Sequence, residues 1–122
     1  MVRHLVREVI RHGHYQDFLA ASKAWNDAAA KHGLPAYRIY ASNWGTFNEV
    51  FAEAEYESSG DIERRFEAAN AANDEAFNQA YRELLSHLVE GEAHDYVLRE
   101  ETLSCLYIGR DGTGSVKVKQ AP

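Results

Sequence analysis

The segment Ala36–Ser58 constrains the fold of this 122-residue chain most strongly, because its pattern is typical of two strands joined by a tight turn. Apolar and polar residues alternate on both sides of a short Asn-Trp-Gly-Thr sequence, which is the period of half-buried strands. Helical periodicity precedes and follows this segment, and alternating residues recur at 1–11 and near 93–101. The expected order is therefore strand, helix, strand, strand, helix, strand.

This order predicts an α+β domain over residues 1–101, with a ferredoxin-like βαββαβ arrangement and a four-stranded antiparallel sheet. Weak helix formers at 70–74 predict a break in the second helical segment. Residues 102–122 change in composition and contain a glycine-rich run. They are expected to form an extra C-terminal hairpin, turning at Asp111-Gly112, or a flexible tail.

Charge and cysteine content narrow the classes of partner. Nineteen acidic residues against thirteen Lys and Arg give a net charge of −6, which disfavours binding to nucleic acid or to an anionic membrane. Cys105 is the only cysteine, so an internal disulfide is excluded and a reducing compartment fits. The first twelve residues carry too many charges for a signal peptide, and no apolar run is long enough to cross a membrane. We expect a cytoplasmic protein whose partner is a small molecule or another protein.

Four short segments lie at the joints of these elements: Gly13-His14-Tyr15, Trp44–Val50, Glu53–Tyr56 and Glu90-Gly91. They resemble the corresponding segments of the dimeric α/β-barrel superfamily, and within it those of small NIPSNAP-like proteins. The resemblance covers roughly residues 1–101. It implies a homodimer in which the helices cover one sheet face, while the other face packs on the sheet of a second subunit.

The strand order implied by the resemblance is 4-1-3-2, which places the first strand beside the third. Arg3 and Arg7 then lie near Glu49 and Glu53 on the face toward the second subunit. Sorting the hairpin by its alternation assigns residues to the two faces. Ile39, Val50, Ala52 and Ala54 are expected under the helices, and Arg38, Tyr40, Glu49, Phe51 and Glu53 on the partner-facing side.

His4 is the candidate catalytic residue. It resembles the first-strand histidine of stress-responsive barrel proteins and polyketide cyclases, which implies a proton acceptor in a cleft between helices and sheet. The alternative is an ordinary strand histidine without a chemical role. Glu8 shares its face, but strand residues four apart are separated by ~13 Å, so a carboxylate partner for His4 must come from another strand. Tyr40, Trp44 and Tyr81 are candidate ligand-binding residues around the same cleft.

Other patterns give weaker signals. His12 and His14 flank a glycine without a carboxylate or cysteine at ligand spacing, so we interpret them as solvated loop histidines and expect no metal site. Asn43, Trp44 and His87 invite comparison with haem-degrading monooxygenases, but the asparagine of those enzymes lies on the first strand, so no cofactor is expected. Ser104 and Cys105 have no base at recognisable spacing, and the glycines near 109–114 do not form a phosphate-binding loop.

Two hypotheses for function follow. The first is a homodimeric small-molecule-binding protein, acting as a cofactor-independent monooxygenase or cyclase on an aromatic or apolar substrate. The second is a non-catalytic dimeric module for assembly or partner binding. An enzyme needs an open pocket that holds His4 and at least one more polar group, whereas a module allows the same space to be filled by Phe, Trp and Leu.

Overall fold

The computed structural model describes residues 1–42, 44–101, 106–110 and 116–120. Its elements up to residue 101 are β1 (Val2–Val9), α1 (Tyr15–Ala30), β2 (Arg38–Ala41), β3 (Glu49–Tyr56), α2 (Ser59–Ala71), α3 (Glu75–Ser86) and β4 (His94–Arg99). The predicted order is confirmed, and so is the break in the second helical segment, which separates α2 from α3. Asp74 caps the new helix by accepting a hydrogen bond from the backbone N–H of Ala76.

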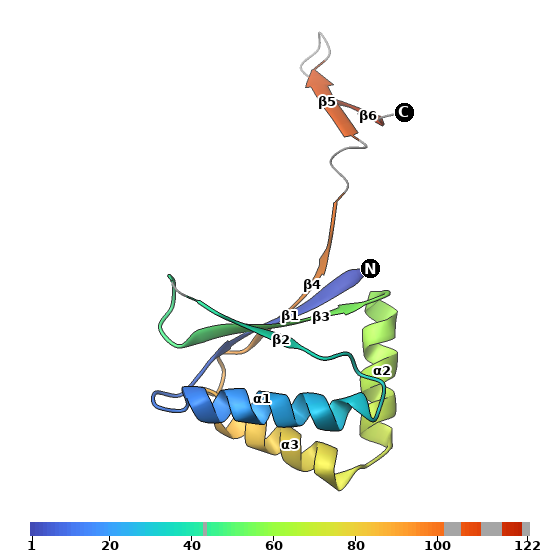
Figure 1. Ribbon diagram of the computed structural model, residues 1–122. Coiled ribbons are helices and arrows are strands. Elements are labelled where there is room, and N and C mark those ends of the chain that lie inside the picture. Colours follow the sequence, from blue (N-terminus) through green and yellow to red (C-terminus); the bar gives the residue numbers. More distant parts are fainter. Residues whose placement is uncertain (43, 102–105, 111–115, 121–122) are drawn as a thin grey trace.

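The four strands form one antiparallel sheet in the order β2-β3-β1-β4, as the resemblance implied. Figure 1 shows all three helices on the same face of this sheet. The central strand β1 pairs with β3 on one side and with β4 on the other, so His4 lies opposite Ala54 and opposite Val97. The opposite face of the sheet is not covered by any helix of the described chain; we call it the open face.

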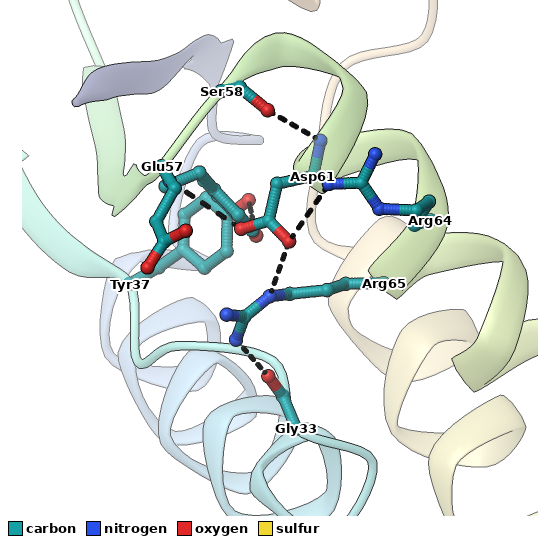
Figure 2. Close-up of polar contacts among 8 residues, drawn as sticks. Gly33, Tyr37, Glu57, Ser58, Asp61, Arg64 and Arg65 are labelled. Carbon is teal, nitrogen blue, oxygen red and sulfur yellow. Dashed lines mark hydrogen bonds and ion pairs between the residues drawn. The ribbon is translucent and has the colours of Figure 1, made fainter.

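The start of α2 shows how local chemistry fixes a helix against its neighbours (Figure 2). The Ser58 hydroxyl accepts a hydrogen bond from the backbone N–H of Asp61 at 3.1 Å, as expected of an N-cap serine. Arg65 donates to the Asp61 carboxylate and, at 2.7 Å, to the carbonyl of Gly33 in the loop after α1. The hydrogen bond from Arg65 holds the pKa of Asp61 below its ordinary value. These contacts tie α2 to the end of α1.

The core lies between the helices and the covered sheet face. Phe18 and Ala29 of α1, Val50 and Tyr56 of β3, and Ala69 of α2 are among its most deeply buried residues. The predicted small, aliphatic face is confirmed, since Val50, Ala52 and Ala54 are all buried under the helices. Sheet and helices thus form two layers, and any cavity between them must open where that packing is incomplete.

The open face carries the predicted cross-strand ion pairs. Arg3 Nε lies 3.4 Å from the carboxylate of Glu53, and Arg7 Nε donates to the carboxylate of Glu49. Arg3 also reaches Glu55 at 3.2 Å. Apolar and aromatic side chains lie among these charges on the same face, contributed by all four strands: Leu5, Tyr40, Phe51, Tyr96 and Leu98.

Two further strands, β5 (Leu106–Arg110) and β6 (Val116–Gln120), pair with each other in a separate antiparallel two-stranded sheet. The predicted turn at Asp111-Gly112, together with Ser104 and Cys105, lies outside the described residues. The domain boundary at residue 101 stays a prediction. Within the described chain, no helix has the length and apolar character needed to cross a membrane.

Candidate functional site

A pocket of about 390 Å³ lies between the helices and the covered sheet face. This volume falls in the range of small-molecule sites. Its wall is mostly apolar, with a few polar groups, and every element from β1 to β4 contributes to it. The lining residues are His4, Val6, Glu8, Phe18, Ser22, Trp25, Asn26, Tyr37, Ile39, Ala52, Ile62, Phe66, Tyr81, Leu84, Leu85, Leu88, Ala93 and Asp95.

The opening of the pocket lies between α3 and β4. Tyr81 and Leu85 of α3 are about half exposed, and the side chain of Asp95 on β4 is 73% exposed. Phe18 and Trp25 of α1, by contrast, are buried and form the closed inner part of the wall. A bound molecule would therefore pass the Asp95 carboxylate on entry and reach the aromatic inner wall.

His4 stands in this pocket between two polar partners. Its Nδ1 lies 2.6 Å from the Tyr37 hydroxyl, and its Nε2 lies 3.4 Å from the Asp95 carboxylate. Asp95 is an acceptor when ionised, so the arrangement is satisfied when Nε2 carries the proton and Nδ1 accepts from Tyr37. The carboxylate partner expected from another strand is thus Asp95, which lies on β4, directly beside β1.

Tyr37 is held in place from two sides. Its backbone N–H donates to the Asn26 side chain, and its carbonyl accepts from the Asn26 amide, both at 2.9 Å. Its hydroxyl lies 2.8 Å from the Tyr56 hydroxyl, which extends the hydrogen-bonded series to Asp95, His4, Tyr37 and Tyr56. Burial raises the pKa of Tyr37. Tyr37 is therefore a neutral hydroxyl that can pass a proton to His4.

Glu8 is the second acidic residue of the pocket. Burial first, and the nearby charge of Asp95 second, raise the pKa of Glu8 from 4.5 to about 7. Among the described residues, the Glu8 carboxyl has neither a hydrogen-bond partner nor an ion-pair partner in the structure. It is consequently an acid–base group that changes charge near neutral pH and has room for a new partner.

Trp25 contributes an unusual donor to the inner wall. It is only 7% exposed, and its indole Nε1–H is the one buried side-chain polar atom of the described residues that lacks a hydrogen-bond partner. A buried donor without a partner is costly, because it has lost its bond to water and gained none in return. Because Nε1 has almost no accessible surface, this donor does not face the open space of the pocket.

The structure brings together two of the four candidate site residues. His4 and Tyr81 line the pocket. Tyr40 pairs with Phe51 on the open face and is 47% exposed, and Trp44 lies in the hairpin loop with 95% of its surface exposed. Neither Tyr40 nor Trp44 lines the pocket, because Tyr40 points to the opposite side of the sheet and the loop carries Trp44 into solvent.

The interpretation of His14 as a solvated loop histidine is wrong, because its ring contacts a buried histidine. Its Nδ1 lies 3.0 Å from Nδ1 of the buried His87, whose Nε2 lies 3.0 Å from the Glu83 carboxylate. His12 is exposed and stacks on Phe47. Both ring nitrogens of His87 thus have partners, and the described residues contain no group of three or more His, Cys, Asp or Glu arranged to hold a metal ion. Asn43, the other residue of the haem comparison, lies outside the described residues.

Sequence reasoning missed Asp95 and Tyr37 as polar residues of the pocket, and it named Glu8 only as sharing the strand face of His4. Asp95 could have been found from two expectations taken together. The first and last strands were expected to pair, and side chains alternate between the two faces along the last strand. Glu8 shared the face of His4, but nothing in the sequence reveals how far burial shifts its pKa. Tyr37 was assigned to the second strand, yet it precedes β2, where Asn26 of α1 fixes its backbone.

Solved structures with the same fold were found by structural comparison. A NIPSNAP family protein of unknown function from Agrobacterium tumefaciens superposes with a TM-score of 0.70 at 15% identity, covering 85% of this chain and 91% of its own. The chain shares its fold with NIPSNAP proteins. An uncharacterised NIPSNAP domain protein from Burkholderia xenovorans gives a TM-score of 0.68 at 15% identity, with 84% and 97% covered. The predicted resemblance is confirmed at the level of fold.

One more distant structural neighbour has a name that states an enzyme activity. An antibiotic biosynthesis monooxygenase superposes with a TM-score of 0.59 at 10% identity, covering 84% of this chain and all of its own. No protein-family model matches the sequence, and no curated protein matches it significantly. At these identities the comparisons show the fold alone, so function must be argued from the pocket.

Proposed function

We propose that this chain is a cytoplasmic homodimer that binds a small aromatic or apolar molecule in the pocket between helices and sheet. One observation carries the proposal: a cavity of about 390 Å³ with a mostly apolar wall also holds His4, Tyr37, Asp95 and Glu8. A few convergent polar groups in an apolar cavity are the usual form of a ligand site.

The chemistry we propose is proton abstraction from the bound molecule, as a cofactor-independent monooxygenase or cyclase requires. A proton taken from the ligand passes to His4 Nδ1, either directly or through the Tyr37 hydroxyl, which then gives its own proton to Nδ1. The Asp95 carboxylate beside Nε2 stabilises the resulting imidazolium. The fold of the antibiotic biosynthesis monooxygenase supports this reaction class by analogy only.

Binding to the pocket can be followed by tryptophan fluorescence. The chain has two tryptophans, so the Trp44→Phe variant leaves Trp25 in the pocket wall as the only one. We expect small neutral aromatics such as 2-phenylethanol to change the Trp25 emission in a saturable way. Tyr81→Ala should weaken binding, whereas Tyr15→Ala, which removes a tyrosine outside the pocket, should leave it unchanged. An unchanged emission with every probe would contradict the proposed site.

The proposed dimer uses the open face. Half-exposed Tyr40, Tyr96 and Leu98 leave apolar surface on a sheet that lacks helices on this side. Such a surface favours a partner. The ion pairs that Arg3 and Arg7 form within the chain remove isolated charges that would otherwise oppose burial. Sedimentation at low micromolar concentration should report two chains, and a monomer would contradict this part of the proposal.

The second candidate, a non-catalytic assembly module, is favoured by the open face alone, since its charges and apolar residues need no pocket to function. This second candidate predicts that no small molecule binds in the pocket. It also predicts that a larger side chain placed in the pocket leaves assembly unchanged. The Trp25 fluorescence experiment separates the two candidates, because only the first requires saturable binding.

A further inference from the structure

The pocket wall contains more acidic than basic side chains. Glu8 and Asp95 are acidic, His4 is the only basic group, and Tyr37 and Tyr81 carry phenols. Among the described lining residues, none is Lys or Arg. The arginines of β1 lie on the other side of the sheet, where they pair with glutamates. The pocket therefore offers a ligand negative charge without a fixed positive charge.

Glu8 is the acidic residue of the pocket wall that has no ion-pair partner among the described residues. It lies on the same strand face as His4 and near Asp95, which pairs with His4. Asp95 thus already has a partner, whereas the Glu8 carboxyl contacts no donor or cation among the described residues. A buried carboxylate is stable only when it is paired or protonated. A cation brought in by the ligand would supply the missing partner.

The rest of the wall fits the body of such a ligand. Aromatic side chains from three helices face the cavity: Phe18 and Trp25 from α1, Phe66 from α2 and Tyr81 from α3. Aromatic faces attract organic cations as well as apolar groups. We infer that the ligand of this pocket is an organic cation, a protonated amine on an aromatic or apolar body, whose ammonium group pairs with Glu8 and Asp95. This inference rests on the proposed function and names the substrate class of the same site.

The alternatives fit the pocket less well. An anionic ligand would meet two acidic groups and no Lys or Arg, so like charges would oppose its entry. A neutral ligand would bring no positive charge to pair with the Glu8 carboxylate, which is ionised above about pH 7. Only a cation both matches the aromatic wall and ionises Glu8 favourably. Ligand binding and the ionisation of Glu8 are linked equilibria. A cation that lowers the pKa of Glu8 when it binds is therefore bound more tightly when Glu8 is ionised.

The test compares three probes of similar shape and different charge: 2-phenylethylamine, 2-phenylethanol and phenylacetate. Each is titrated into the Trp44→Phe protein near pH 8, with Trp25 emission as the signal. An opposite charge close to a carboxyl shifts its pKa by about 1–3 units, so the amine should bind roughly tenfold or more tightly than the alcohol. Phenylacetate should bind most weakly. Trp44 does not line the pocket, so this comparison leaves every pocket residue unchanged.

Two variants assign the preference to the pocket carboxyl. Glu8→Gln should reduce the preference for the amine over the alcohol by about tenfold or more, while binding of the alcohol persists. Glu63→Gln removes one charge from the exposed surface of α2 and should keep the preference. The preference should also weaken as pH falls through about 7, where Glu8 becomes protonated, and this step should be absent in Glu8→Gln.

The outcomes separate this inference from the proposed function. Equal or tighter binding of the alcohol overturns the cation preference but leaves a small-molecule pocket. An amine preference that survives in Glu8→Gln also overturns it, because the charge would then be recognised elsewhere. Failure of all three probes to bind overturns both the inference and the proposed site.

Discussion

Glu8 should make the folded protein less stable as the pH rises from mildly acidic to neutral. Its pKa is about 7 in the folded chain, above the ordinary value of 4.5, so the folded state holds the proton more tightly than the unfolded state. Between these two values the unfolded chain has lost the proton that the folded chain keeps. The free energy of unfolding therefore falls with rising pH across this window, which is opposite to the usual behaviour of a salt-bridged carboxylate.

The size of the effect follows from the shift. Each pKa unit corresponds to about 1.4 kcal/mol, so the move from 4.5 to about 7 amounts to about 3 kcal/mol. The Glu8→Gln variant lacks the titrating group and should not show this loss. Relative to its own value near pH 5, wild type should lose about 3 kcal/mol more than the variant by pH 8. In melting temperature, this difference is on the order of 10 °C for a domain of this size.

The assay is urea unfolding of both proteins at fixed protein concentration, in steps of pH from about 4.5 to 8.5. The quantity of interest is the difference between the two stability curves, because titrating groups that do not interact with Glu8 cancel in it. Glu63→Gln serves as the control, since an exposed carboxylate should give a nearly flat difference. If the wild-type and Glu8→Gln curves run parallel over this range, burial does not raise the pKa of Glu8 and the electrostatic description of the pocket is wrong.

Three further substitutions test other parts of the structure. Tyr37→Phe removes the hydroxyl beside His4, so unfolding should become easier by about 1–3 kcal/mol; an unchanged urea midpoint would show that this hydrogen bond contributes nothing. Ser58→Ala removes the N-cap of α2 and should cost about 1 kcal/mol in the same assay, with a gain in stability counting against the cap. Arg7→Glu should weaken the proposed dimer in sedimentation, whereas Arg82→Glu on exposed α3 should not; equal effects would refute the role of the open face.

Much of the fold was predictable, because strand alternation and helix periodicity are local properties of the sequence. The two faces of the hairpin were assigned correctly, since one residue in two must lie under the helices. The ion pairs of Arg3 and Arg7 followed once the first strand was placed beside the third, and that placement came from the family resemblance. The ends of elements were less exact: the alternation predicted a first strand over residues 1–11, whereas β1 runs from Val2 to Val9.

The pocket was less predictable, because it depends on distances between segments that are far apart in the chain. His4 was found from its resemblance to other first-strand histidines, but its partners Asp95 and Tyr37 are 91 and 33 positions away from it in sequence order. Tyr40 and Trp44 were candidates as aromatic residues near the expected cleft. Residue type alone does not reveal which side of a sheet a side chain occupies, and the alternation that placed Tyr40 on the partner-facing side already argued against it.

The central strand explains why binding and assembly can be tested separately in this protein. Along β1, His4 and Glu8 face the pocket, while Arg3 and Arg7 face the open side of the sheet. Successive side chains of a strand point to opposite faces, so a substitution on one face reaches the other only through the backbone. Arg7→Glu should therefore weaken assembly and leave probe binding, measured by Trp25 emission, unchanged. Glu8→Gln should change probe binding and leave assembly unchanged. If both changes affect both properties, the two faces of the sheet are not independent and this separation is wrong.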